Sequence, residues 1–436
     1  MLQQLVFGVT LALAAYFIRK RVLEIKANIY LGKENKITDN AGKRFLTMAL
    51  VAFGQKKMFK RFIPAILHLF IYVGFLVINI EVLEFVIDGL AGTHRIFAPF
   101  LGEFYNVLMN VFELLAVAVL IACVAFLFRR NILKVKRFWS SEMTSWPRLD
   151  ANIILITEIL LMGAILTMNA TDQVLQAKDP HYTATGFLFF SGQLVPIFQD
   201  LTISTLVVIE RLAWWFHIIG ILGFAVYITY SKHLHIFMAF PNTYYANVEP
   251  NGHIKNMPVV TNEVKIMLGI SGAETTPATQ SGRFGAKDIN DLNWNNLMAA
   301  YACTECGRCT AECPANLTGK KLSPRKIMMD TRDRMQEVRK SLGSGGKGLE
   351  DGKSLLGDYI TKEEINACTS CNACVEACPV MINPLEIIIE MRRYVAMEES
   401  GSPASWNSMF QNIETNFAPW KFSPGDRFNW ANDLKK

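Results

Sequence analysis

Long runs of apolar residues fill most of the first 240 positions of this chain, whereas polar residues, Gly and Pro are frequent afterwards. A helix needs about 20 mostly apolar residues to cross the hydrocarbon core of a bilayer. The pattern therefore predicts five membrane-spanning helices, at about 1–18, 62–80, 104–128, 151–169 and 212–230, the second continuing as far as 87. The change in composition near residue 240 predicts a domain boundary there.

The remainder of the chain is expected to hold a smaller helical domain. We expect a linker at 241–290, an α-helical domain at 291–398 and a partner-docking C-terminal tail at 399–436. The Gly-rich stretch 341–357 is expected to be a flexible insertion. Because backbone polar groups within a bilayer must be satisfied internally, the predicted fold class is all-α, a five-helix transmembrane bundle followed by this domain.

Eight of the nine cysteines form two copies of one spacing. The copies are Cys303-x2-Cys306-x2-Cys309-x3-Cys313-Pro314 and Cys368-x2-Cys371-x2-Cys374-x3-Cys378-Pro379. This is the bacterial ferredoxin run, in which the fourth thiolate binds the neighbouring [4Fe–4S] cluster. The spacing predicts two such clusters and an electron-carrying protein. One cluster is assigned to Cys303, Cys306, Cys309 and Cys378, the other to Cys368, Cys371, Cys374 and Cys313.

Other uses of the cysteines are less consistent with the pattern. Zinc sites are usually built from pairs of CxxC, which gives the third closely spaced cysteine no role. A chain this long and apolar does not need a disulfide framework. Cys123 lies alone in the third predicted span and is expected to be a packing residue.

Basic residues predict the orientation in the membrane. The segment 19–61 holds twelve Lys and Arg and 129–149 holds six, whereas 81–103 and 170–200 hold almost none. By the positive-inside rule the N-terminus is outside, and the basic segments and ferredoxin domain are cytoplasmic. We therefore expect a multi-pass protein of the cytoplasmic (inner) membrane, with 1–18 as a retained signal anchor. The net charge of +6 belongs mostly to these segments, so lipid rather than nucleic acid is the expected contact.

Three histidines lie in or next to the predicted spans: His68, His217 and His235. On a continuous helix His217 and His235 are five turns apart, so they share a face at a separation of about 27 Å. His68, near the cytoplasmic end of its span, is placed to face His235 across a haem, and His217 is a candidate ligand at another depth. His233 points elsewhere on such a helix and is the weaker candidate. The alternative is an ordinary polar helix end with buried, hydrogen-bonded histidines.

With five predicted spans, a histidine early in the second and two histidines eighteen residues apart from the fifth onward, the membrane part resembles the cytochrome b subunit of respiratory nitrate reductase and the membrane subunit of heterodisulfide reductase. The polar domain, whose motifs are followed by Pro-led helices at Ser323-Pro324 and Asn383-Pro384, resembles the iron–sulfur subunit of heterodisulfide reductase. Fusions of both parts occur in membrane-bound Fe–S oxidoreductases that connect electron-transfer flavoprotein to menaquinone. The segment 410–432 is similar to the linker that follows the clusters in those fusions.

Two departures limit what the resemblance implies. The family places a second haem-binding His ten residues after the first, where this chain has Ile78, so an outer haem lacks an evident fourth ligand. His94 and His181 lie in outer segments, but we expect both to be surface residues. The fusions also continue into Cys-Cys-Gly repeats beyond the position where this sequence stops, so that chemistry is expected in a partner chain.

The resemblance implies a quinone-linked oxidoreductase subunit. It would move electrons between a membrane quinone, namely menaquinone, and a cytoplasmic redox protein through two [4Fe–4S] clusters and one or two b-type haems. The cytoplasmic partner would be a Cys-Cys-Gly-domain subunit or electron-transfer flavoprotein. A redox-sensing or assembly module anchored to the membrane without haem is the alternative. Glu113 and Glu158, single carboxylates in spans, are expected to make structural contacts rather than to relay protons.

Overall fold

A computed structural model describes residues 1–270, 283–421 and 423–434. Helices dominate these ranges, and their β-structure is limited to isolated bridges such as the one between Lys33 and Asn293. The predicted all-α fold class is therefore confirmed.

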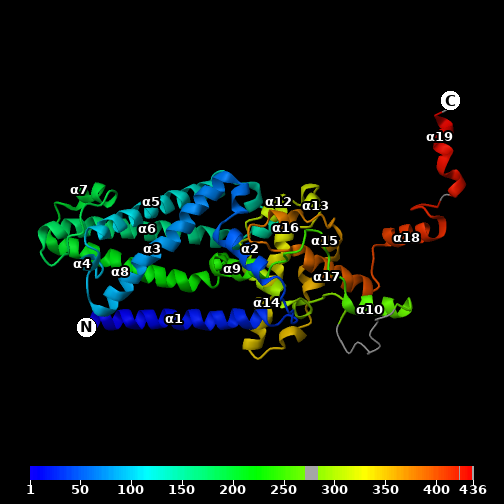
Figure 1. Ribbon diagram of the computed structural model, residues 1–436, viewed down its shortest axis with the longest axis horizontal. Coiled ribbons are helices and arrows are strands. Elements are labelled where there is room, and N and C mark those ends of the chain that lie inside the picture. Colours follow the sequence, from blue (N-terminus) through cyan, green and yellow to red (C-terminus); the bar gives the residue numbers. More distant parts are fainter. Residues whose placement is uncertain (271–282, 422, 435–436) are drawn as a thin grey trace.

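Five long helices form the bundle and run roughly side by side (Figure 1). They are α1 (Leu2–Ile29), α3 (Phe62–Ala91), α5 (Glu103–Asn131), α6 (Trp146–Lys178) and α8 (Ile203–Ile228). Each is long and apolar enough to cross a membrane, as predicted. Packing continues from α1 through α3, α5, α6 and α8 back to α1, so the helices close into a ring.

The predicted spans differ from the helices mainly at their ends. The span was predicted to begin at 212 because the charged residues Glu210 and Arg211 interrupt the apolar run. In the structure α8 begins at Ile203, and the two residues form an ion pair of 2.8 Å within the helix. Glu210 is almost fully buried. The helix thus carries its own ion pair at a position that hydropathy alone places outside the span.

Shorter helices connect the bundle to a second helical body at one of its ends (Figure 1). The bundle and its connections contain α2 (Ala41–Met48), α4 (Ala98–Leu101), α7 (Val195–Phe198), α9 (His235–Tyr245) and α10 (Pro258–Met267). The second body contains α11 (Trp294–Ala302), α12 (Arg308–Ala311), α13 (Pro314–Leu317), α14 (Pro324–Gly343), α15 (Lys362–Asn366), α16 (Ala373–Ala377) and α17 (Pro384–Met397). The last helices, α18 (Ala404–Asn416) and α19 (Asn429–Asp433), lead away from it (Figure 1).

The segment expected to be a linker, 241–290, contains more structure than a loop. It includes the C-terminal part of α9 and all of α10, and α9 packs against α2 and α11. Residues 271–282 of this segment lie outside the described residues.

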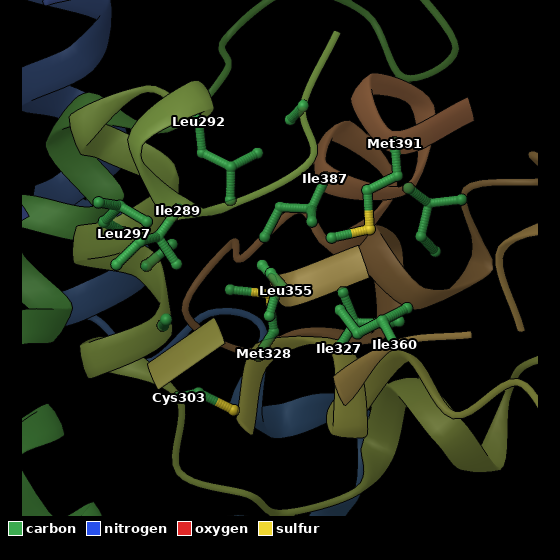
Figure 2. Close-up of a cluster of buried hydrophobic side chains, with 14 of the residues drawn as sticks. Ile289, Leu292, Leu297, Cys303, Ile327, Met328, Leu355, Ile360, Ile387 and Met391 are labelled. Carbon is green, nitrogen blue, oxygen red and sulfur yellow. The ribbon is translucent and has the colours of Figure 1, made fainter. Parts of the chain in front are cut away.

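The second body, which we call the cysteine domain, is built around an aliphatic core shared by α11, α14 and α17 (Figure 2). Both Pro-led helices form where expected, and each is capped by the side chain before the proline, Ser323 on α14 and Asn383 on α17. The core residues drawn in Figure 2 include Ile289, Leu297, Ile327, Met328, Leu355, Ile387 and Met391.

The prediction that 341–357 is a flexible insertion is wrong for its second half. Leu355 and Leu356 are buried in the core of the cysteine domain. The fully buried Arg334 donates to both carboxylate oxygens of Asp351 and also binds Asp288. A high glycine content suggested flexibility, but this buried ion pair fixes the segment.

Direct contacts hold the cysteine domain on the bundle. Asn28, at the end of α1, donates to the Tyr301 hydroxyl over 2.7 Å, and Arg325 reaches Glu142 between α5 and α6 over 2.7 Å. Arg61 pairs with Glu312 at 2.8 Å. Both basic segments therefore lie at the end of the bundle that bears the cysteine domain.

Candidate functional site

The two cysteine runs fold as backbone repeats. In the first run Glu305 and Gly307 have positive φ angles of 54° and 70°, and in the second Ser370 and Asn372 have 54° and 60°. These positions correspond in the spacing, two and four residues after the first cysteine. The left-handed residues turn the chain sharply so that successive thiols can face one enclosed volume.

The fourth cysteine of the second run, Cys378, lines the same cavity as the first three cysteines of the first run. A small cavity is lined by Cys303, Cys306 and Cys309 together with Cys378 and Cys374. Burial and then the neighbouring thiol of Cys306 raise the pKa of Cys378 to about 11. This donor set of soft thiols fits one iron–sulfur cluster.

Cys313 is correspondingly close to the second run. Burial and then the neighbouring thiols of Cys368 and Cys313 raise the pKa of Cys374 to about 12. The peptide N–H of Ser370 donates to the Cys368 sulfur at 3.4 Å, and that of Ile382 donates to the Cys378 sulfur at 3.3 Å. Such donors stabilise negative charge on cluster sulfurs and thereby tune the potential.

The candidate haem ligands line a single cavity of about 810 Å³. Its walls are mostly apolar and include four histidines, His68, His217, His233 and His235. The cavity extends from His217 in the middle of α8 to Cys306 in the cysteine domain. We call it the histidine cavity; its volume lies within the roughly 300–1,000 Å³ typical of cofactor pockets.

Two of these histidines present a free ring nitrogen in a defined tautomer. His217 Nδ1 lies 2.9 Å from the Leu161 carbonyl oxygen, and His235 Nδ1 lies 3.2 Å from that of Lys232. Because a carbonyl only accepts, Nδ1 must carry the proton in both rings, which leaves the Nε2 lone pair available. The buried Nε2 of His217 has no hydrogen-bond partner among the described residues. This is the arrangement of metal-binding histidines.

The rings of His68 and His235 have the spacing of a ligand pair. Their centres are 6.3 Å apart. With metal–imidazole bonds of about 2 Å on each side, two rings that hold one metal ion have centres separated by roughly 6 Å. The geometry therefore suits a haem iron between α3 and the start of α9.

The helix that was expected to carry both His217 and His235 is broken between them. α8 ends at Ile228, a short 3-10 turn occupies Lys232–Leu234, and His235 begins α9. The Ser231 hydroxyl caps the turn by accepting from the His233 N–H at 2.9 Å. The argument that the two histidines share one helical face is therefore wrong, although both line the cavity.

His233, which a continuous helix would turn elsewhere, lies beside His235. Its ring stacks on His235 with centres 5.4 Å apart, and it lines the same cavity. The signal was present, because Ser231 is a strong helix-start residue that interrupts α8 before His233.

The two outer histidines have different surroundings. His181 is exposed and pairs with Asp179, as expected for a surface residue. His94 keeps its side chain 25% exposed, but its Nε2 lies 3.3 Å from the buried Asp172 and its ring contacts Tyr182. Neither lines the histidine cavity, where Ile78 occupies the position of the family's second ligand.

The two single carboxylates in the spans, Glu113 and Glu158, also have different surroundings. Glu113 accepts from Asn169 at 3.1 Å and from the backbone N–H of Ser191 at 3.2 Å, which confirms a structural role. Glu158 lines the histidine cavity instead. Cys123 is fully buried among apolar residues and is a packing residue, as predicted.

A buried polar network at the far end of the bundle was not predicted. Arg95 donates to Asp172 at 2.7 Å and to Asn169 at 2.9 Å, and Tyr105 donates to Glu84 at 2.7 Å. Arg95 lies in the segment after α3, and its pairing with Asp172 and Asn169 of α6 is not visible in a local pattern.

Comparisons with known proteins agree with this architecture. A family model described as a 4Fe-4S dicluster domain matches residues 302–382. The probable iron-sulfur-binding oxidoreductase FadF of Bacillus subtilis is 28% identical over 98% of this chain and 61% of its own length. The EtfAB:quinone oxidoreductase of Syntrophomonas wolfei is 27% identical over 94% of this chain and 57% of its own length. The chain is similar to membrane iron–sulfur oxidoreductases.

A shorter match concerns the membrane attachment. A probable membrane-anchored ferredoxin of Chromohalobacter salexigens is 35% identical over 34% of this chain and 24% of its own length. No solved structure matches the chain. The chain spans about 60% of the length of the first two relatives. The predicted resemblance to membrane iron–sulfur oxidoreductases is confirmed, as is a membrane protein with a dicluster iron–sulfur domain.

Proposed function

We propose that this chain conducts electrons between menaquinone in the membrane and a redox partner at the cysteine domain, through b-type haem and two [4Fe–4S] clusters. The observation that carries the proposal is the histidine cavity, which extends without interruption from His217 past His68 and His235 to Cys306. The haem and the clusters would supply one-electron carriers. The chain's own residues position them and exclude water.

The ligand assignment follows the donor sets described above. His68 and His235 would hold one haem, and His217 is the candidate for a second. Cys303, Cys306, Cys309 and Cys378 would hold the cluster nearer the cavity, and Cys368, Cys371, Cys374 and Cys313 the other. The free Nε2 atoms favour this function over an anchored sensing or assembly module, which has no use for imidazoles in a prepared tautomer.

A second cavity, of about 300 Å³, is a suitable quinone site. It lies at the bundle end away from the cysteine domain and combines aromatic walls, including Phe85 and Trp214, with His94 and Asp172. Phe85 also contacts the ring of His217, with centres 5.8 Å apart. A quinone ring there would be flanked by the aromatic side chains, with His94, which pairs with Asp172, available for proton exchange.

The membrane orientation and the protein partner belong to the same proposal. Both basic segments lie beside the cysteine domain, so the positive-inside rule would place that domain in the cytoplasm. The tail at 399–436 exposes Trp406, Phe410 and Ile413 on α18 and would dock the partner. Electron-transfer flavoprotein or a Cys-Cys-Gly-domain subunit fits the resemblance stated for the sequence.

A dithionite-minus-air difference spectrum of the purified chain tests the proposal. We expect the bands of low-spin b-type haem, together with a broad bleaching from the clusters. A chain with full iron–sulfur content and no haem signal would contradict the proposal and favour the anchored module.

A further inference from the structure

Three arginines close the end of the histidine cavity nearest the cysteine domain. Arg130 comes from the last turn of α5, Arg137 from the 3-10 turn Lys136–Phe138, and Arg308 from the start of α12, two residues after Cys306. The guanidinium groups of Arg130 and Arg137 lie over the same Phe138 ring, with distances of 4.5 Å and 4.9 Å to its centre. Cation–π contact therefore holds both groups in place.

These guanidinium groups lack acidic partners in the described part of the chain. Arg130 Nε and Nη2 and Arg137 Nε are buried without a hydrogen bond, and none of the three arginines forms an ion pair there. The carboxylates nearby are already engaged. Glu305 binds Lys232 and Arg332, Glu142 binds Arg325, and Asp150 accepts from Tyr227 and from the Lys232 N–H.

Like charges and burial make this arrangement unfavourable by itself. Burial lowers the pKa of Arg137 to about 10; the Cys306 thiol opposes this shift, and the nearby charges of Arg61 and Arg308 add to it. A buried charge without a partner is strongly destabilising, whereas a bound anion with matching geometry offsets that loss. A guanidinium group matches a carboxylate or phosphate through paired N–H donors.

We propose that Arg130, Arg137 and Arg308 bind the two propionate carboxylates of the haem between His68 and His235. This inference rests on the proposed function and specifies how that haem is oriented. The histidine cavity is apolar around the histidines and cationic at one end, which matches a macrocycle that carries both carboxylates on one edge. Arg308 lines the same cavity as the ligand pair and lies two residues after Cys306. The propionate edge of the haem would then face the cluster nearer the cavity, which Cys306 would help to hold.

The phosphate of an anionic lipid has similar chemistry and is the competing occupant. The test compares Arg130→Gln, Arg137→Gln and Arg130→Lys with Arg148→Gln in the purified full-length chain. Arg148 is a matched control because its Nε is also buried without a hydrogen bond among the described residues, yet its guanidinium lies over Trp139 and does not line the cavity. Potentiometric titration gives the haem midpoint potential, and the phosphorus content of delipidated protein gives bound lipid.

Loss of a cation beside the propionates stabilises ferric haem. We therefore expect a lower midpoint potential in both Gln variants, a smaller shift in Arg130→Lys and none in Arg148→Gln, with unchanged cluster signals. Unchanged potentials accompanied by loss of bound phosphorus would assign the arginines to a lipid and overturn the inference, as would unchanged potentials alone.

A second measurement needs no variant. Wild-type protein depleted of haem is reconstituted with haem or with haem dimethyl ester, which lacks the carboxylates. The ester is expected to bind more weakly and at a higher potential, because it removes the negative charges that stabilise ferric haem while the arginine cations stay, and equal behaviour of both would contradict the inference. A wild-type chain that binds no haem in cells would instead refute the proposed function itself.

Discussion

His68 and His235 face each other with ring centres 6.3 Å apart, although one lies on α3 and the other begins α9. The end of α8 at Ile228 and the turn that follows it bring the two rings together. Ser231 caps a new turn, and the Lys232 N–H donates to Asp150 on α6 at 3.1 Å, which anchors this turn to the bundle.

Replacement of either histidine should therefore remove one haem. We expect His68→Ala and His235→Ala to lose haem that is measured by the pyridine haemochrome assay, because each leaves the iron with one axial ligand. His233→Ala should retain it, and His181→Ala is a surface control. Haem retained by His235→Ala but lost in His233→Ala would identify His233 as the ligand.

The cysteine runs should exchange their fourth ligands. The purified chain is expected to contain about eight cluster irons, since each run completes one four-iron cluster. Cys313→Ser should damage the cluster bound by Cys368, Cys371 and Cys374, and Cys378→Ser should damage the other. Electron paramagnetic resonance of the reduced variants distinguishes the two clusters, and the opposite pairing of losses would overturn the crossed assignment.

The buried ion pairs of Arg334 should dominate the stability of the cysteine domain. Arg334→Ala leaves the buried Asp288 and the partly exposed Asp351 without their partner, and breaking a buried pair typically costs roughly 3–5 kcal/mol. Thermal loss of the cluster absorbance should occur at a clearly lower temperature than in the wild type. The exposed Lys340→Ala on the same helix should change it little, and equal effects of both would refute the role of Arg334.

The features predicted correctly are those encoded locally. An apolar run identifies a span, and the cysteine spacing identifies a cluster loop, because neither depends on distant residues. The surroundings of His94, His233 and Arg334 were not predicted because they are set by residues remote in sequence. Asp172, for example, belongs to α6 and reaches His94, in the segment after α3, only in the folded bundle.

The quinone site is expected in the second cavity, beside His94. His94→Ala should slow haem reduction by a menaquinol analogue by on the order of 100-fold, the usual effect of losing a positioned proton-transfer group. Haem content and cluster signals should be unchanged, because His94 does not line the histidine cavity. His181→Ala is the matched control, since it changes a histidine in an exposed segment that pairs only with Asp179 in the described structure. Normal reduction kinetics in His94→Ala would show that quinol binds elsewhere, and the Glu158 side of the histidine cavity would then be the next place to test.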